Sequence, residues 1–199
     1  HHKGNVSYIP EKYTVAAFSK RRSALAILNY VELRSGVRIK QRLLKKLQLH
    51  ETALLQLDET INILFMVDLM MLLKSFGYQA LDMRALGLNS IKRTLHLPFA
   101  KTLYTCQSIP DLYRCYLEKE VRSLEKNTTY RYLDIDKASF LVEALQNEEL
   151  IEALKNKRYG SPNICEFKTG GIGNITLYAG MPAIHAVKTK CIHQGDPAC

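Results

Sequence analysis

The stretch Cys191-Ile-His-Gln-Gly-Asp-Pro-Ala-Cys199 holds two cysteines on either side of a turn sequence, Gly-Asp-Pro. Residues 184–192 before the turn read as a strand, so a hairpin would bring the two cysteines face to face. A third cysteine, Cys165, lies 26 residues before Cys191. Three thiols that meet in one place form a metal site, a redox pair with a spare thiol, or a chance grouping, and the residues alone leave all three open.

Length and composition describe an ordinary globular chain. Its 199 residues form one large domain or two small ones, and a hydrophobic content of 47% suffices for a sizeable core. The most apolar run, residues 61–73, contains Asp68 and is shorter than the roughly 20 residues of a spanning helix. No signal-peptide pattern is present, and the two leading histidines look like the remnant of a purification tag. We therefore expect a cytoplasmic protein with no membrane span and no disulfide framework.

Helical periodicity dominates the chain up to about residue 126. It predicts helices over residues 16–34, 37–49, 51–75 with a break near 58, 81–95 in one or two pieces, and 108–125. The centre of the third helix is apolar nearly all round, which is typical of a core helix. Its methionines give a soft and adaptable surface, so the same helix could instead line a pocket for an apolar ligand.

The remainder of the chain mixes strands and helices. We predict a strand over residues 128–135, a helix over 137–157, a strand over 163–167, a glycine-rich turn over 168–174 and a short helix over 175–180. The expected fold class is α+β: a helical N-terminal part packed with a small antiparallel sheet and helices, ending in a cysteine-bearing β-hairpin. The expected divisions are residues 1–12, a tag remnant and flexible start, 13–126, mainly helical, and 127–199, a compact α+β module.

The C-terminal block resembles a known family. Asn163-Ile-Cys165, the glycines that follow, Ala179-Gly180-Met-Pro, Cys191 and Gly195-Asp-Pro-Ala-Cys199 are similar to the 4-vinyl-reductase-type domain. The resemblance implies a small α+β module related to subunits of vesicle-tethering complexes. It also implies kinship with the effector-sensing domain of aromatic-responsive bacterial transcription activators. In those activators zinc is held by one cysteine, a glutamate and a pair of cysteines, at the spacings of Cys165, Cys191 and Cys199.

One position departs from that pattern. Lys188 stands where the family's glutamate is expected, three residues before the second cysteine, and an ammonium group is no zinc ligand. Structural zinc is nearly always four-coordinate, and His193 is the best local substitute for the missing ligand. Three alternatives remain: a zinc site of three cysteines and His193, reduced thiols without metal, or a Cys191–Cys199 disulfide. Glu166, beside Cys165 in a predicted strand, is expected to point to the opposite face.

The polar residues do not group as an active site would, so no enzyme is expected. The function we expect is a ligand-sensing regulatory domain of a bacterial signalling or transcription protein, with an internal apolar pocket. Seven residues are the candidate lining of that pocket: Phe65, Met66, Leu69, Met70, Tyr113, Tyr116 and Phe140. Because the related sensors hold phenols with a tryptophan and this chain has none, a flexible acyl-type ligand is favoured. The alternative is a non-enzymatic dimerisation or assembly module like the tethering subunits.

The net charge of +9 is concentrated in one run. Between residues 34 and 46 there are six arginines and lysines and no acid, which is either a solvated helix face or a patch that binds a partner. Residues 37–57 could form a helix-turn-helix, but the recognition helix, 52–57, would carry no arginine or lysine for base contacts. We therefore expect DNA binding only through a domain not present in this chain, and a homodimer as the oligomeric state.

Overall fold

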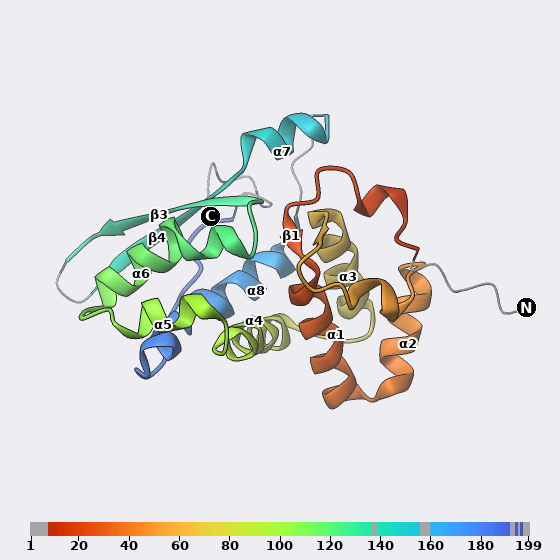
Figure 1. The fold of residues 1–199 in the computed structure, drawn as a ribbon, viewed down its shortest axis with the longest axis horizontal. Coiled ribbons are helices and arrows are strands. Elements are labelled where there is room, and N and C mark those ends of the chain that lie inside the picture. The colour runs from red at the N-terminus through yellow and green to blue at the C-terminus, as the bar shows by residue number, and fades with distance from the viewer. Residues whose placement is uncertain (1–7, 137–138, 156–159, 192–193, 195, 197–199) are drawn as a thin grey trace, which may run out of the picture.

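The computed structural model describes residues 8–136, 139–155, 160–191, 194 and 196. It confirms the α+β class: helices predominate, and the described strands form two separate two-stranded antiparallel sheets. Figure 1 shows a group of helices from the N-terminal part beside a second group that carries a long β-hairpin. None of the described helices combines the length and the apolar character that crossing a membrane requires.

The N-terminal group consists of three α-helices and four short elements. In chain order they are η1 (Glu11–Tyr13), β1 (Ser19–Lys20), α1 (Arg21–Ser35), α2 (Val37–Lys46), η2 (Glu51–Leu54), β2 (Thr60–Ile61) and α3 (Ile63–Ser75). Gly36, at a φ of 83°, both ends α1 and precedes α2. The helix predicted over 51–75 with a break near 58 is interrupted there: η2 ends at Leu54, residues 55–62 are not helical, and α3 begins at Ile63. Asn62 is extended and its side chain accepts a hydrogen bond from the Leu64 N–H, so the helix begins there.

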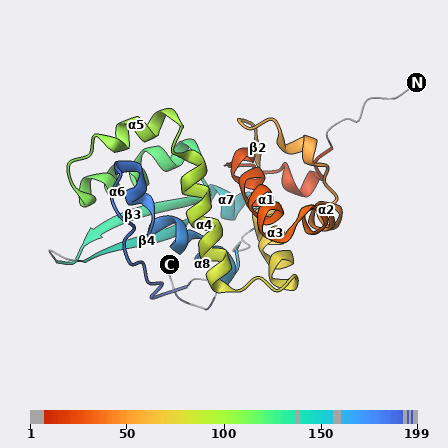
Figure 2. The ribbon, with the colours of Figure 1, turned by 90° about the horizontal axis from the view of Figure 1, so that it is seen from below.

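Helices α4 (Ala80–Thr94) and α8 (Pro162–Ile172) cross at the centre of the molecule (Figure 2). A Cβ added to Gly87 of α4 would lie 2.0 Å from the carbonyl oxygen of Phe167, and one added to Gly170 of α8 would lie 2.1 Å from that of Arg84. Both glycines therefore allow the two backbones to touch. The predicted strand over 163–167 and the predicted glycine turn are wrong, because these glycines serve helix contact inside one continuous helix.

The second group completes the fold. It contains α5 (Pro98–Tyr104), α6 (Ile109–Glu118), η3 (Glu120–Ser123), β3 (Thr128–Asp134), β4 (Phe140–Gln146), α7 (Glu148–Ala153) and η4 (Ile175–Ala179). Strands β3 and β4 pair over their whole length, from Thr128 opposite Gln146 to Asp134 opposite Phe140. The predicted strand over 128–135 is confirmed. The predicted helix over 137–157 is wrong for residues 140–146, because pairing with β3 overrides the local helical preference of glutamate, alanine and leucine.

Two hydrophobic clusters form the core, and α4 contributes to both. Met83 and Leu86 belong to the first cluster, with side chains of α1, α2 and α3, whereas Ile91 belongs to the second, with side chains of α5 and α6. Leu150 of α7 and Ile164 of α8 pack into the first cluster. The last part of the chain is thus buried against the helical N-terminal part.

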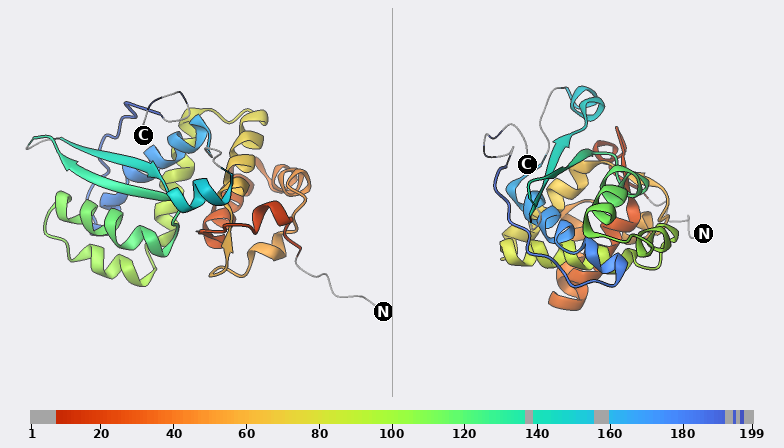
Figure 3. Two further views of the ribbon diagram at one scale, coloured as in Figure 1. Left: turned by 90° about the horizontal axis from the view of Figure 1, so that it is seen from above. Right: turned by 90° about the vertical axis from the view of Figure 1, so that its left-hand side faces the viewer.

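The chain after η4 is extended but forms no strand within residues 181–191, so the predicted strand over 184–192 is wrong there. Figure 3 draws it as a smooth trace. The Ile184 N–H donates to the Gly173 carbonyl oxygen at 2.9 Å. At the other end, the Cys191 carbonyl oxygen accepts from Gln194 at 2.8 Å and from Asp196 at 3.3 Å. The chain therefore turns after Cys191, while Ile192, His193 and Cys199 of the predicted hairpin lie outside the described residues.

Candidate functional site

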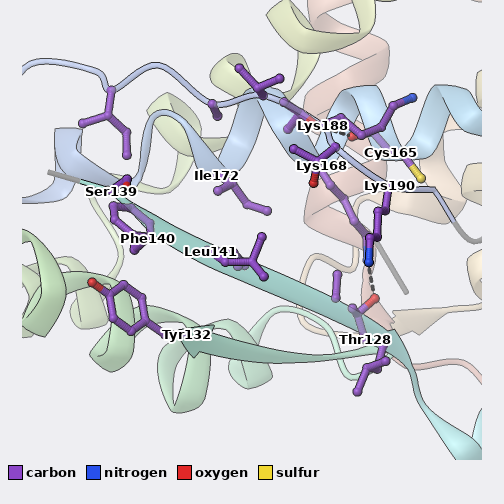
Figure 4. Close-up of a pocket in the computed structure, with 18 of the residues that line it drawn as sticks. Thr128, Tyr132, Ser139, Phe140, Leu141, Cys165, Lys168, Ile172, Lys188 and Lys190 are labelled. Carbon is purple, nitrogen blue, oxygen red and sulfur yellow. Dashed lines mark hydrogen bonds between the residues drawn. The ribbon is translucent and has the colours of Figure 1, made fainter. Parts of the chain in front are cut away.

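A groove of about 500 Å³ lies between β4, α8 and residues 184–190. Its two long walls are the hairpin and the extended segment, and α8 crosses between them (Figure 4). The exposed surface inside it is mostly apolar. A volume of this size falls within the range of small-molecule sites, about 300–1,000 Å³. The groove is therefore the candidate functional site among the described residues.

The end of the groove near the tip of the hairpin is lined mainly by aromatic and aliphatic side chains, together with Asp134 and Asp136. The Phe140 ring stacks on Tyr132 with centroids 5.0 Å apart and contacts Tyr113 at 4.7 Å. Ile172 of α8 and Ile184 of the extended segment line the same end. The Tyr113 hydroxyl donates to the Ile172 carbonyl oxygen, and burial raises the pKa of this phenol well above its ordinary value. Tyr113 thus ties α6 to α8 beside the groove and stays neutral.

The opposite end of the groove is rich in lysine. Lys168 of α8 donates to the Thr128 hydroxyl (Figure 4). Its ammonium group also stands 3.8 Å from Glu125 and lies over the Tyr130 ring. Lys190 is exposed, lines the same groove and makes no ion pair with any residue that the structure describes. This end therefore carries positive charge that protein carboxylates do not fully compensate.

Lys188 and Glu166 form a charged group with Arg84 just behind this end. The two oxygens of Glu166 accept from Lys188 and from Arg84, each at 2.7 Å. Burial alone would raise the pKa of Glu166, but the hydrogen bonds from Lys188 and Arg84 hold that pKa below its ordinary value. Glu166 lies on helix α8 and not on the strand that was predicted for it. Its side chain therefore reaches both Lys188 and Arg84. The lysine at the family's glutamate position thus connects the extended segment to α8.

Cys165 and Cys191 meet in the interior. Their Sγ atoms are 3.4 Å apart, and both residues are buried, at 6% and 1% exposure. Two thiolates on one tetrahedral zinc, with Zn–S bonds of about 2.3 Å, stand roughly 3.8 Å apart, so this pair fits two corners of such a site. The described residues contain no group of three side chains that could hold a metal. The other two predicted ligands, His193 and Cys199, lie outside the described residues, so the zinc site stays a prediction.

The seven residues predicted to line a pocket lie in different places. Phe65, Met66, Leu69 and Met70 are buried in the first hydrophobic cluster, and Tyr113 and Tyr116 in the second. Of the seven, only Phe140 lines the groove. The groove residues on α8 were missed because that segment was read as strand and turn. Ser161-Pro162 was an available signal: proline at the first helical position predicts a helix that aligns Cys165, Lys168 and Ile172 on one face.

Comparison of the chain with protein-family models, curated proteins and solved structures finds no match. The resemblance to the 4-vinyl-reductase-type domain therefore stays a prediction that rests on its residues.

Proposed function

We propose that this chain is a ligand-sensing regulatory domain of a bacterial signalling or transcription protein, and that a small apolar ligand binds in the groove. The observation that carries the proposal is the groove itself: an apolar space of about 500 Å³ beside a paired hairpin. The site differs in place from the pocket expected around α3, whose inward side chains fill the core. An acyl chain would lie along β4, which lines the groove from Phe140 to Gln146, opposite the extended segment.

The extended segment is the part of the groove whose conformation a bound ligand would change. Residues 184–190 form one wall of the groove, yet they make no strand ladder with β4. Contacts at a few points hold them: Ile184 to Gly173, Lys188 to Glu166, and the turn after Cys191. A ligand that contacts both walls binds best to the conformation in which the segment is closest, and so shifts the population toward it. A partner or an output domain would read that shift.

The cysteine pair would fix one end of this wall. With zinc bound to Cys165, Cys191, His193 and Cys199, the metal would supply a structural cross-link between α8 and the end of the segment. Metal analysis of the purified protein should then find about one zinc per chain, and a chelator should lower the melting temperature. Protein that contains no zinc and melts identically in chelator would remove the metal from the proposal while leaving the groove intact.

Native mass spectrometry of the protein as purified tests the main proposal. The expected spectrum contains a fraction of the chain with a bound lipid-sized mass that is released on activation. A delipidated sample should regain mass when a straight-chain fatty acid is added. If neither sample binds any apolar compound, the sensor proposal fails.

A second candidate is the assembly module, and the hairpin favours it. Leu133, Ile135 and Leu141 are large apolar residues at 44%, 63% and 39% exposure on or beside β3 and β4. Exposed apolar side chains along a hairpin are typical of a pairing surface. Analytical ultracentrifugation distinguishes the candidates: a homodimer that Ile135→Lys dissociates supports assembly, whereas a monomer at all accessible concentrations contradicts it.

A further inference from the structure

We infer that the groove selects a single-chain amphipath with one anionic head, and that the head lies at the end formed by Thr128, Lys168 and Lys190. This inference rests on the proposed ligand-binding function and specifies the chemical class of the ligand. A carboxylate and a phosphate head satisfy the same chemistry. The tail would lie along β4 toward Phe140 and Ile172.

The distribution of charge along the groove carries the inference. Three of its lining side chains are lysines, 168, 188 and 190, and they belong to the end near Thr128 (Figure 4). The lining carboxylates, Asp134 and Asp136, belong to the hairpin tip, at the other end of the β3–β4 register. Asp134 is paired with Arg114, whereas Lys190 has no ion-pair partner among the described residues, so a negative head is attracted to the lysine end, and this fixes the direction in which the ligand lies.

The lysines differ in how far their charges are already compensated. Lys188 is held by Glu166, and Lys168 has Glu125 at 3.8 Å as well as the Thr128 hydroxyl. Lys190 has no ion-pair partner among the residues that the structure describes. An anionic head that bonds Lys190 and shares Lys168 with Thr128 would complete this group with charge-assisted hydrogen bonds.

The apolar part of the groove fits one alkyl chain. Strand β4 spans seven residues, from Phe140 to Gln146, which corresponds to a length of about 20 Å at roughly 3.3 Å per residue. Phe140, Val142, Ala144 and Leu145, which are spread along this strand, all line the groove. The volume of about 500 Å³ is lined by β4 from Phe140 to Gln146 and so is not confined to one end of the strand. It therefore suits a single extended chain better than a compact ring system.

Calorimetric titration of the delipidated chain with matched ligands tests this inference. The ligands are dodecanoate, dodecyl phosphate, dodecanol and dodecyltrimethylammonium, each below its micelle concentration. Both anions should bind at least about tenfold more tightly than the alcohol, and the ammonium compound should bind most weakly. The relative affinities of dodecanoate and dodecyl phosphate tell which head the site prefers.

Two lysine variants and one control identify the end that holds the head. Lys190→Gln, at an exposed position, should weaken both anions several-fold and leave dodecanol unchanged, and Lys168→Met should act in the same direction. Lys45→Gln, on the exposed face of α2 far from the groove, should change nothing. Equal affinity for the alcohol and the anions, or an equal loss for all ligands in Lys190→Gln, overturns the inference but not the apolar site. Binding of none of the four ligands overturns the proposed function itself.

Discussion

Replacing Gly170 by alanine should destabilise the protein by separating α4 from α8. A Cβ at this position would lie 2.1 Å from the carbonyl oxygen and 2.6 Å from the Cα of Arg84. Both are backbone atoms, so no side-chain rotation relieves the overlap. Alanine ordinarily gains about 1 kcal/mol over glycine inside a helix. Overpacking a tight contact costs typically about 1–3 kcal/mol and sometimes more. Because the helices must move apart along their whole contact, we expect a cost at the top of this range and a net loss of about 2 kcal/mol.

Gly171 provides a matched control on the same helix. The nearest atom to a Cβ there is the Gly87 carbonyl oxygen at 3.9 Å, an ordinary van der Waals contact. Gly171→Ala should therefore remain within about 1 kcal/mol of the wild type. Urea unfolding followed by circular dichroism measures the difference. With a slope of about 2 kcal/mol per molar urea, Gly170→Ala should lower the midpoint by roughly 1 M. Equal midpoints for the two variants would refute the close contact between α4 and α8, which places the groove residues of α8.

Three further predictions concern charged residues and the cysteine site. Lys40 is 4% exposed and bonds Glu32 at 2.7 Å and Glu51 at 2.5 Å. Lys40→Met should therefore lower the free energy of unfolding, measured in urea, by about 2–3 kcal/mol. The control Lys45→Met, on the exposed face of α2, should lower it by less than about 0.5 kcal/mol. The hydrogen bond from the Gln79 N–H, more than the ion pair with Arg34, holds the pKa of Asp82 below its ordinary value. The Asp82 carboxylate therefore stabilises the fold at a pH above the ordinary pKa, and this stabilisation is lost as the pH falls through the folded pKa. Asp82→Ala should therefore cost about 1 kcal/mol at neutral pH, and its unfolding free energy should fall less than that of the wild type between about pH 5 and 2. Cys165→Ser should abolish zinc binding and the effect of chelator on melting, and a variant that retains stoichiometric zinc would contradict the predicted ligand set.

The sequence predicted local features well and long-range pairing poorly. The helix predicted to begin near residue 108 does so, and the Ser108 hydroxyl accepts a hydrogen bond from the Asp111 N–H at the start of α6. The boundary predicted between the helices over 16–34 and 37–49 likewise falls at Gly36, between α1 and α2. Strand β4 was missed because Phe140-Leu-Val-Glu-Ala-Leu carries a helical composition, and only its partner β3 makes it a strand. Helix α8 was missed because its glycines read as a turn, although they are required by the contact with Gly87 and Arg84.

The candidate site is built from elements whose secondary structure was predicted wrongly, namely β4, α8 and the extended segment. The spacing of 26 residues singled out Cys165 and Cys191, and the structure places their sulfur atoms 3.4 Å apart. The groove could not be derived in this way, since its walls are β4, α8 and an extended segment, each of which was assigned another structure. The methionine-rich α3 was singled out because it is apolar on all sides, but an entirely apolar helix is buried whether or not a ligand is present, and its side chains lie in the first hydrophobic cluster.

The central claim is that the groove beside β4 binds an apolar ligand, and a groove-filling variant tests it most directly. Leu141 lines the groove at 39% exposure, so Leu141→Trp should occupy the space without disturbing the core. Leu95→Trp, at 41% exposure on the end of α4 and away from the groove, is the matched control. In a dodecanoate titration we expect Leu141→Trp to bind at least about tenfold more weakly than the wild type, with Leu95→Trp unchanged. Equal affinity in all three proteins would contradict the claim.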